Sequence, residues 1–228
     1  IGGTPGYDMG VLFTDEGERL SIVDDKGRTI QGNNLFAALC LLVAKTTSDP
    51  TIAMSVTAPL RLEELLKREK AAVIRTKADT RSLMSSSLDA GVDFAGDERG
   101  GFIFPALHPG FDAMFSLAKL LAMRQATGLS LSEVLESLPS FALAYEQVRC
   151  PWEAKGAVMR LITEQHRDDE RVELVDGIKI FNEDSWVLVL PDAVEPVFHI
   201  YAESTEPKES EALVDDYVRR IEELQTGV

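Results

Sequence analysis

The stretch VDGIKIFNEDSWVLVLPDAVEPVFHIYAES, residues 175–204, consists of short runs of apolar and β-branched residues separated by turn residues. Asp176-Gly177 stands between two such runs, and Asp-Gly in that position is a strong signal for a β-hairpin. Pro191–Pro196 separates the last two runs. Four strands are therefore expected, at Val172–Val175, Ile178–Phe181, Trp186–Leu190 and Val197–Glu203.

Helices are expected on both sides of these strands, at Ala154–His166 and Lys208–Leu224. This order indicates a small α+β domain with a four-stranded antiparallel sheet and two helices, which we assign to residues 149–228. The segment after Pro139, Ser140–Val148, is interpreted as a linker over residues 140–148.

Residues 1–139 follow a different pattern, in which strand and helix signals alternate. The strand-like run Thr51–Val56, for example, follows an apolar-faced helix at Asn34–Lys45. Such alternation favours an α/β domain with a mixed sheet and helices on its faces. Near its end, Ser130 and Glu133 have the spacing of a capping box, which predicts the start of a short helix.

The composition is that of a globular cytoplasmic protein, with 45% hydrophobic and 27% charged residues. A formal net charge of −15 argues against nucleic acid and against an anionic membrane as partners. The longest apolar run, Leu35–Ala44, is too short to span a bilayer. Cys40 and Cys150 are expected to be free thiols. The chain opens on Ile1–Gly6, loop residues without an initiator Met, and we expect a piece of a longer chain.

Three short segments carry side chains that could do chemistry. In GVLFTDEGERLSIVD, residues 10–24, acidic residues Asp15, Glu16 and Glu18 either converge on a hard cation or form a solvated acidic turn. Gly96–Gly101 reads as a glycine-rich turn between two strands, with Arg99 available to an anion or to Asp97 or Glu98. Lys77 and Arg81 either line a pocket or begin a solvated helix.

Taken together with VDFAGDERGGFIFP (residues 92–105) and VIRTKADTRSLM (residues 73–84), these segments resemble the third and fourth domains of the α-D-phosphohexomutases, the phosphomannomutase and phosphoglucomutase family. The resemblance runs from about Gly6 to Leu224. In that family a D-x-D-x-D-R segment holds Mg²⁺. Thr14, Glu16 and Glu18 stand at the three aspartate places and Arg19 at the arginine place, which implies weak or absent Mg²⁺ binding and leaves Arg19 as the candidate catalytic residue.

The resemblance also implies a sugar-reading loop and basic residues that contact the substrate. The family pattern G-E-x-S-G-H corresponds to Gly96–Gly101, so Asp97 takes the glutamate place and Arg99 the serine place. Lys77 and Arg81 are similar to basic residues that contact sugar and phosphate near this strand end. A hexose phosphate is the implied ligand, bound weakly or not at all.

The fourth domain of the family binds the substrate phosphate through an R-P-S-G-T-E-P loop. Here Pro191, Glu195 and Pro196 remain, but four positions have changed and are expected to be non-functional: Leu190, Asp192, Ala193 and Val194. Arginine and hydroxyl donors suit a dianion, whereas leucine, aspartate and valine side chains supply none of these donors.

Two functions follow as expectations. One is part of a phosphohexomutase that moves phosphate on a hexose, with degraded metal, sugar and phosphate motifs. The other is a non-catalytic regulatory or oligomerisation module, which the degraded motifs favour. Residues 57–84 are similar to mutase-type regions fused to mannose-1-phosphate guanylyltransferase, so this module would belong to a sugar-nucleotidyltransferase of that type. The phosphoserine loop T-A-S-H-N does not occur in this sequence, so we expect it to be inactive alone and to work with N-terminal domains of the same chain or in a homo-oligomer.

Overall fold

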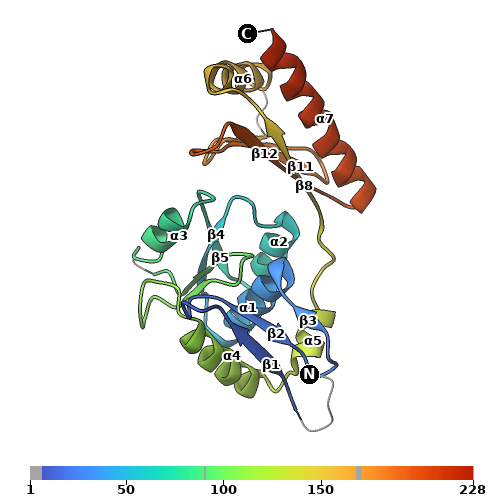
Figure 1. Cartoon of the computed structure of the whole chain (residues 1–228). Helices are drawn as coiled ribbons and strands as arrows, with labels where there is room; N and C mark the ends of the chain where they lie inside the picture. Colours follow the sequence, from blue (N-terminus) through green and yellow to red (C-terminus); the bar gives the residue numbers. More distant parts are fainter. Residues whose placement is uncertain (1–6, 90, 168–170, 228) are drawn as a thin grey trace. The chain divides into compact units, whose positions relative to one another are not determined.

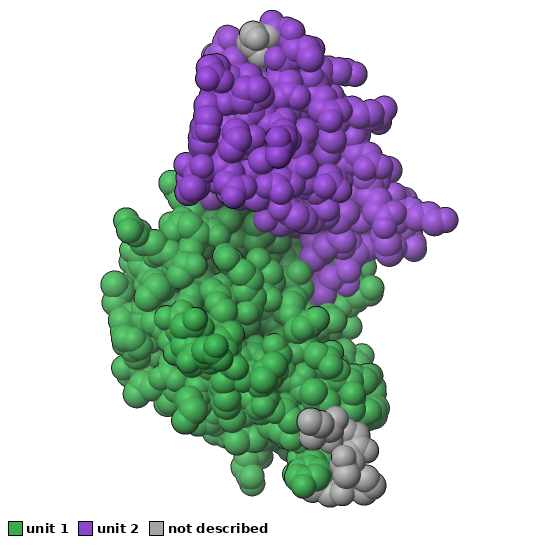
Figure 2. All heavy atoms as spheres, viewed as in Figure 1, with its two compact units in different colours: residues 1–140 green, residues 141–228 purple. Residues whose placement is uncertain are grey.

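The computed structural model describes residues 7–89, 91–167 and 171–227, so the expectation about Ile1–Gly6 lies outside the described residues. The chain divides into two compact units, residues 1–140 and residues 141–228, which are coloured separately in Figure 2. Figure 1 labels the helices of both units and, where there is room, their strands.

Unit 2 is a five-stranded antiparallel sheet with two helices. Its strands are β8 (Ala142–Arg149), β9 (Val172–Glu173), β10 (Ile178–Phe181), β11 (Trp186–Pro191) and β12 (Val197–Ser204), in the order β8-β12-β11-β10-β9. Helices α6 (Trp152–Gln165) and α7 (Pro207–Thr226) pack on the sheet around a core of buried residues that includes Val158, Ile200 and Ile221. The Asp-Gly hairpin is confirmed, since β9 and β10 pair antiparallel.

The predicted linker at residues 140–148 is wrong over most of its length, and so is the count of four strands. Residues 142–149 form β8, which pairs with β12 from Ser204↔Ala142 to Val197↔Arg149. The sequence ALAYEQVR hides this strand because only one residue is β-branched and the middle of the strand is polar. An edge strand tolerates that composition, and Tyr145, Glu146 and Gln147 are exposed.

Unit 1 contains a three-stranded antiparallel hairpin sheet and a mixed four-stranded sheet. The hairpin sheet has the order β1-β2-β3 (Gly10–Phe13, Leu20–Val23, Thr29–Ile30), and the mixed sheet has the order β5-β4-β6-β7 (Ala72–Thr76, Thr51–Ser55, Phe94–Gly96, Phe102–Ile103). Strand β4 runs parallel to β5 and β6, whereas β7 is antiparallel to β6. The predicted mixed sheet is confirmed. The helices are α1 (Gly32–Thr46), α2 (Leu60–Arg68), α3 (Thr80–Ser86), α4 (Ala113–Thr127) and α5 (Leu131–Glu136).

Helices cover both faces of the mixed sheet. On one face, Leu83 of α3 packs with Ala53 and Ala95. On the other, the ring of Phe36 on α1 stacks 6.2 Å from Phe94 and 6.5 Å from Phe102. Successive strand residues point to opposite faces, so the small alanines face α3 and the phenylalanines face α1. Helix α1 is buried from Leu35 to Ala44, which accounts for the long apolar run.

Strand β4 lies at a topological switch point. The chain leaves β4 through α2 to reach β5 on one side, and returns through α3 to β6 on the other side. Ligands of open α/β sheets bind beyond the carboxyl ends of the strands at such a point. Here those ends are Ser55, Thr76 and Gly96, which directs attention to the loops that follow them.

Within residues 7–89, 91–167 and 171–227, no helix combines the length and the apolarity needed to cross a bilayer. Cys40 and Cys150 are buried free thiols, and burial raises the pKa of each.

Candidate functional site

An ion pair joins the turn between β1 and β2 to the loop after β6. One Nη nitrogen of Arg19 donates to Asp97 Oδ1 at 2.8 Å and to Oδ2 at 3.0 Å. The Asp97 side chain is only 6% exposed and that of Arg19 is 22% exposed. A charge-assisted hydrogen bond between partly buried side chains is stronger than a salt bridge on the surface.

The backbone of the second loop closes around the same carboxylate. Asp97 Oδ1 accepts the N–H groups of Arg99 at 3.0 Å and Gly101 at 3.1 Å. Gly100 has a φ of +82°, and a Cβ there would lie 2.4 Å from the carbonyl oxygen of Leu20, so this position requires glycine. Asp97 therefore lies at the centre of the loop, and its carboxylate accepts hydrogen bonds from Arg19 and from two backbone N–H groups of the loop.

The Arg19 guanidinium has a second neighbour that fixes its position. Its Cζ lies 4.8 Å from the centroid of the Phe111 ring, within the range of a cation–π contact. The backbone around it is also paired, because Arg19 forms an antiparallel bridge with Gly101 and Gly17 accepts a hydrogen bond from Ala113 at the start of α4. The turn, the loop and the helix are thus joined at one point.

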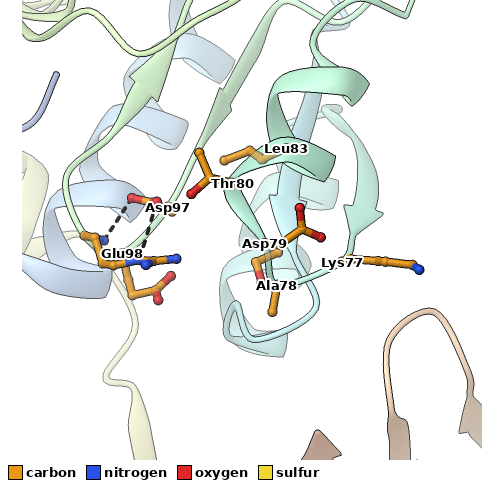
Figure 3. A pocket seen from close by; sticks show the side chains of 9 residues that line it. Lys77, Ala78, Asp79, Thr80, Leu83, Asp97 and Glu98 are labelled. Carbon is orange, nitrogen blue, oxygen red and sulfur yellow. Dashed lines mark hydrogen bonds and ion pairs between the residues drawn. The ribbon is translucent and has the colours of Figure 1, made fainter. Parts of the chain in front are cut away.

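A small pocket lies at the carboxyl ends of β4 and β6 and is shown in Figure 3. Its lining includes Ser55, Lys77, Thr80 and the consecutive residues 97–99. In Figure 3 the Lys77 side chain points away from Asp97 and Glu98, which lie on the opposite side of the pocket. Arg81 is exposed and is not among the residues that line it. The structure therefore brings Lys77 and Arg99 to one pocket and leaves Arg81 outside it.

In unit 2 the loop from Leu190 to Pro196 folds around Asp192. Its Oδ1 accepts the backbone N–H groups of Val194 and Glu195, both at 2.7 Å, and its Oδ2 lies 2.9 Å from His199 Nε2. His199 and these two amides lower the pKa of Asp192 to about 2. Leu190 is buried, whereas Ala193 and Val194 are exposed.

A buried lysine on α6 holds the backbone of this loop. Lys155 of α6 donates from Nζ to the carbonyl oxygens of Asp192 and Glu195, both at 2.6 Å. Its Nζ also lies 4.3 Å from the centroid of the Trp152 ring. The loop shape is held by these contacts together with the prolines at either end.

Comparisons with known proteins found a family model and several relatives that are similar to this chain. Residues 31–141 match the family model for phosphoglucomutase/phosphomannomutase, alpha/beta/alpha domain III. A probable phosphoglucosamine mutase from Methanopyrus kandleri is 28% identical over 223 residues, which are 96% of this chain and 49% of the relative. These matches support the α-D-phosphohexomutase family.

Solved structures of phosphohexomutases share the fold. A phosphoglucomutase/phosphomannomutase family protein from Burkholderia thailandensis has a TM-score of 0.78 at 19% identity, covering 100% of this chain and 49% of its own. Aspergillus fumigatus N-acetylphosphoglucosamine mutase, solved with GlcNAc-6P and magnesium, has a TM-score of 0.67 at 11% identity, covering 96% of this chain and 49% of its own. The chain thus spans about half the length of the phosphohexomutases it matches.

The residues of this chain that were expected at the metal places do not fit Mg²⁺. Thr14, Glu16 and Glu18 are all exposed, and Thr14 Oγ1 accepts the backbone N–H of Arg19 at 3.3 Å. Among the residues that the structure describes, no group of three or more His, Cys, Asp or Glu side chains could hold a metal ion. Mg²⁺ prefers several preorganised oxygen ligands, and one hydroxyl with two exposed carboxylates does not provide them.

Three residues of unit 2 that we did not predict support the loop Leu190–Pro196. They are Lys155, His199 and Tyr145, whose hydroxyl lies 2.9 Å from His199 Nδ1. A sequence signal existed for His199, because strand alternation separates it from Phe198 and Ile200, which face the core. Lys155 and Tyr145 gave no such signal, since one lies on a helix and the other in the strand interpreted as a linker.

Replacing Asp97 with Asn should destabilise unit 1 by about 2–3 kcal/mol, because the amide loses the charged contact to Arg19 but still accepts the loop N–H groups. Both tryptophans, Trp152 and Trp186, lie in unit 2. Urea unfolding followed by circular dichroism should show the loss, while tryptophan fluorescence should show an unchanged midpoint for unit 2.

The matched control for that substitution is Arg99→Gln, since the Arg99 side chain is 56% exposed and its Nε lies 3.7 Å from the same carboxylate. We expect this control to change the stability of unit 1 by less than about 0.5 kcal/mol. Equal losses in the two variants would contradict a special role for the Arg19–Asp97 pair.

The low pKa of Asp192 predicts an acid-dependent contribution to the stability of unit 2. A folded pKa of about 2 against an ordinary value of 3.8 means that the unfolded chain binds the proton first as pH falls. The contribution, about 2 kcal/mol, is complete above pH 5 and is lost as pH falls from about 4 to 2. The stability gap between the native protein and Asp192→Asn, measured by tryptophan fluorescence, should therefore shrink between pH 5 and pH 2.5. A constant gap would refute the assignment.

Proposed function

We propose that this chain is the sugar-facing half of a phosphohexomutase-family protein in hexose-phosphate metabolism, and that this half does not itself hold the metal or the substrate phosphate. One observation carries the proposal. The charged groups at the family's functional positions are engaged with one another, Arg19 with Asp97 and Asp192 with its own loop and His199.

The proposal separates the shape of the site from its chemistry. Gly100 and the Arg19–Gly101 bridge keep the loop after β6 in a defined form, and Lys155 does the same for the loop after β11. The side chains that would contact a sugar phosphate are lacking, because leucine and valine replace an arginine and a hydroxyl. This half therefore serves as a structural or regulatory module of the larger protein, and we expect no turnover from it alone.

A second candidate is the mutase-type module of a mannose-1-phosphate guanylyltransferase fusion, which the sequence of residues 57–84 favours. The sequence upstream of Ile1 distinguishes the two. A G-x-G-x-R-L nucleotidyltransferase signature there supports the fusion, and an intact T-A-S-H-N loop supports a working mutase.

If only side chains are missing, phosphate binding should be restored by repairing them together. The variant carries Leu190→Arg, Asp192→Ser, Ala193→Gly and Val194→Thr. Arginine adds a charge-assisted contact of about 1.5–3 kcal/mol, and removing the carboxylate relieves repulsion of a few kcal/mol at an effective dielectric near 20. NMR titration with mannose 1-phosphate should shift the amides of residues 190–196 in the variant and not in the native chain.

The control for this experiment is the single variant Leu190→Arg, which adds the positive charge but keeps Asp192. It should bind much more weakly than the fourfold variant. Tight binding of mannose 1-phosphate by the native loop would overturn the proposed function.

A further inference from the structure

The loop after β6 borders two cavities of very different size. The pocket beside Lys77 and Thr80, shown in Figure 3, has a volume of about 10 Å³, which is room for about one water molecule. The second cavity has a volume of about 380 Å³, within the size range of small-molecule sites. Its walls come from the start of β2, the start of α1 and residues 98–100. The space for a ligand therefore lies beside α1 and not in the pocket beside Lys77.

The walls of the larger cavity are held in place by backbone contacts. The Leu20 N–H donates to the carbonyl oxygen of Gly100 at 3.1 Å. Asp97 fixes the same loop, because its carboxylate accepts the N–H groups of Arg99 and Gly101. These contacts exist before any ligand enters, so little conformational freedom is lost when one binds.

Two opposite charges line this cavity without neutralising each other. Among the residues that the structure describes, the Glu98 carboxylate makes no hydrogen bond or ion pair. In the same described part of the chain, the Arg99 side chain makes one ion-pair contact, a long one from Nε to Asp97 Oδ2 at 3.7 Å. The two terminal nitrogens of Arg99, the fork that suits a carboxylate, are therefore available to a ligand. One free negative group and one free positive group complement a molecule that carries both charges.

Two uncharged polar side chains complete the lining. Within the described ranges, neither the Ser21 hydroxyl nor the Gln31 amide makes a hydrogen bond. Both groups can donate and accept, so each can meet an amide or a hydroxyl of a ligand. The polar side chains of this cavity thus differ from Asp97 and Asp192, whose carboxylates accept hydrogen bonds from their own loops.

We propose that this cavity is a binding site for a polar α-amino acid. The carboxylate of the ligand pairs with Arg99 and its ammonium pairs with Glu98. The amide or hydroxyl of its side chain bonds to Ser21 and Gln31. This inference goes beyond the proposed function and does not depend on it, because the cavity includes neither the expected metal residues nor the loop Leu190–Pro196. It gives a regulatory module a ligand that is neither a sugar nor a phosphate.

L-Glutamine is the probe, because it carries both charges and a side-chain amide. Two analogues each lack one charge: 4-carbamoylbutanoate has no ammonium, and 4-aminobutanamide has no carboxylate. Titration of the whole chain, followed by NMR, should give saturable shifts in the amides of residues 98–101. L-Glutamine should bind at least about tenfold more tightly than either analogue, because each analogue lacks one charged contact.

Two variants assign the two charges to their partners. Glu98→Gln should weaken the binding of L-glutamine and leave that of 4-carbamoylbutanoate unchanged, because this analogue has no ammonium. Arg99→Gln should weaken both of these ligands and leave 4-aminobutanamide unchanged. Arg81→Gln is the matched control, since Arg81 is exposed and lies outside the lining of the cavity. It should change none of the three affinities.

The outcomes are distinct. Selectivity for L-glutamine that is lost in Glu98→Gln and Arg99→Gln, and kept in Arg81→Gln, supports the inference. Equal affinities for the three ligands, or no saturable binding of L-glutamine, overturn it. Weaker binding in Arg81→Gln also overturns it, because the effect would then come from net charge and not from the cavity. None of these results bears on mannose 1-phosphate binding by the loop Leu190–Pro196, which tests the proposed function separately.

Discussion

The ion pair between Arg19 and Asp97 is the contact on which the arrangement of unit 1 depends. It joins residues 78 positions apart and holds the β1–β2 turn against the loop that follows the central strands. With the Arg19–Gly101 bridge, the Phe111 ring and the Gly17–Ala113 hydrogen bond, it forms a closed set of contacts. Because the carboxylate already accepts two loop amides and a guanidinium, little of its hydrogen-bonding capacity remains for a sugar.

In unit 2, too, a carboxylate accepts hydrogen bonds from its own loop and from a side chain of another element, here Asp192 with His199. Without the Asp192 side chain, the backbone N–H groups of Val194 and Glu195 would lose their acceptor, and unpaired donors in a half-buried loop cost free energy. Asp192 supplies the acceptor from within the chain. The Asp192 side chain therefore stabilises this loop through contacts from within the chain.

Local signals in the sequence were sufficient for much of the fold. The Asp-Gly hairpin formed as expected, and in the capping box Ser130 Oγ accepts the Glu133 N–H at 3.2 Å while Glu133 Oε2 accepts the Ser130 N–H at 2.8 Å. Strand β8 escaped prediction because its identity depends on pairing with β12, far along the chain. The expected contact between Arg99 and Asp97 is present at 3.7 Å, but the shorter contact from Arg19 escaped prediction for the same reason, since Arg19 lies 78 positions away. The inward role of Asp192 required Lys155 and His199, which only the folded chain brings together.

The central claim is that the family's functional positions in this half no longer serve the family's ligands, and Mg²⁺ binding tests it most directly. Calorimetric titration of the chain with Mg²⁺ should give no saturable heat at low-micromolar concentration, because Glu16 and Glu18 are exposed and Thr14 replaces a carboxylate. Glu16→Gln should then behave like Glu64→Gln, a control on the exposed side of α2. Low-micromolar affinity that is lost in Glu16→Gln and kept in Glu64→Gln would contradict the account.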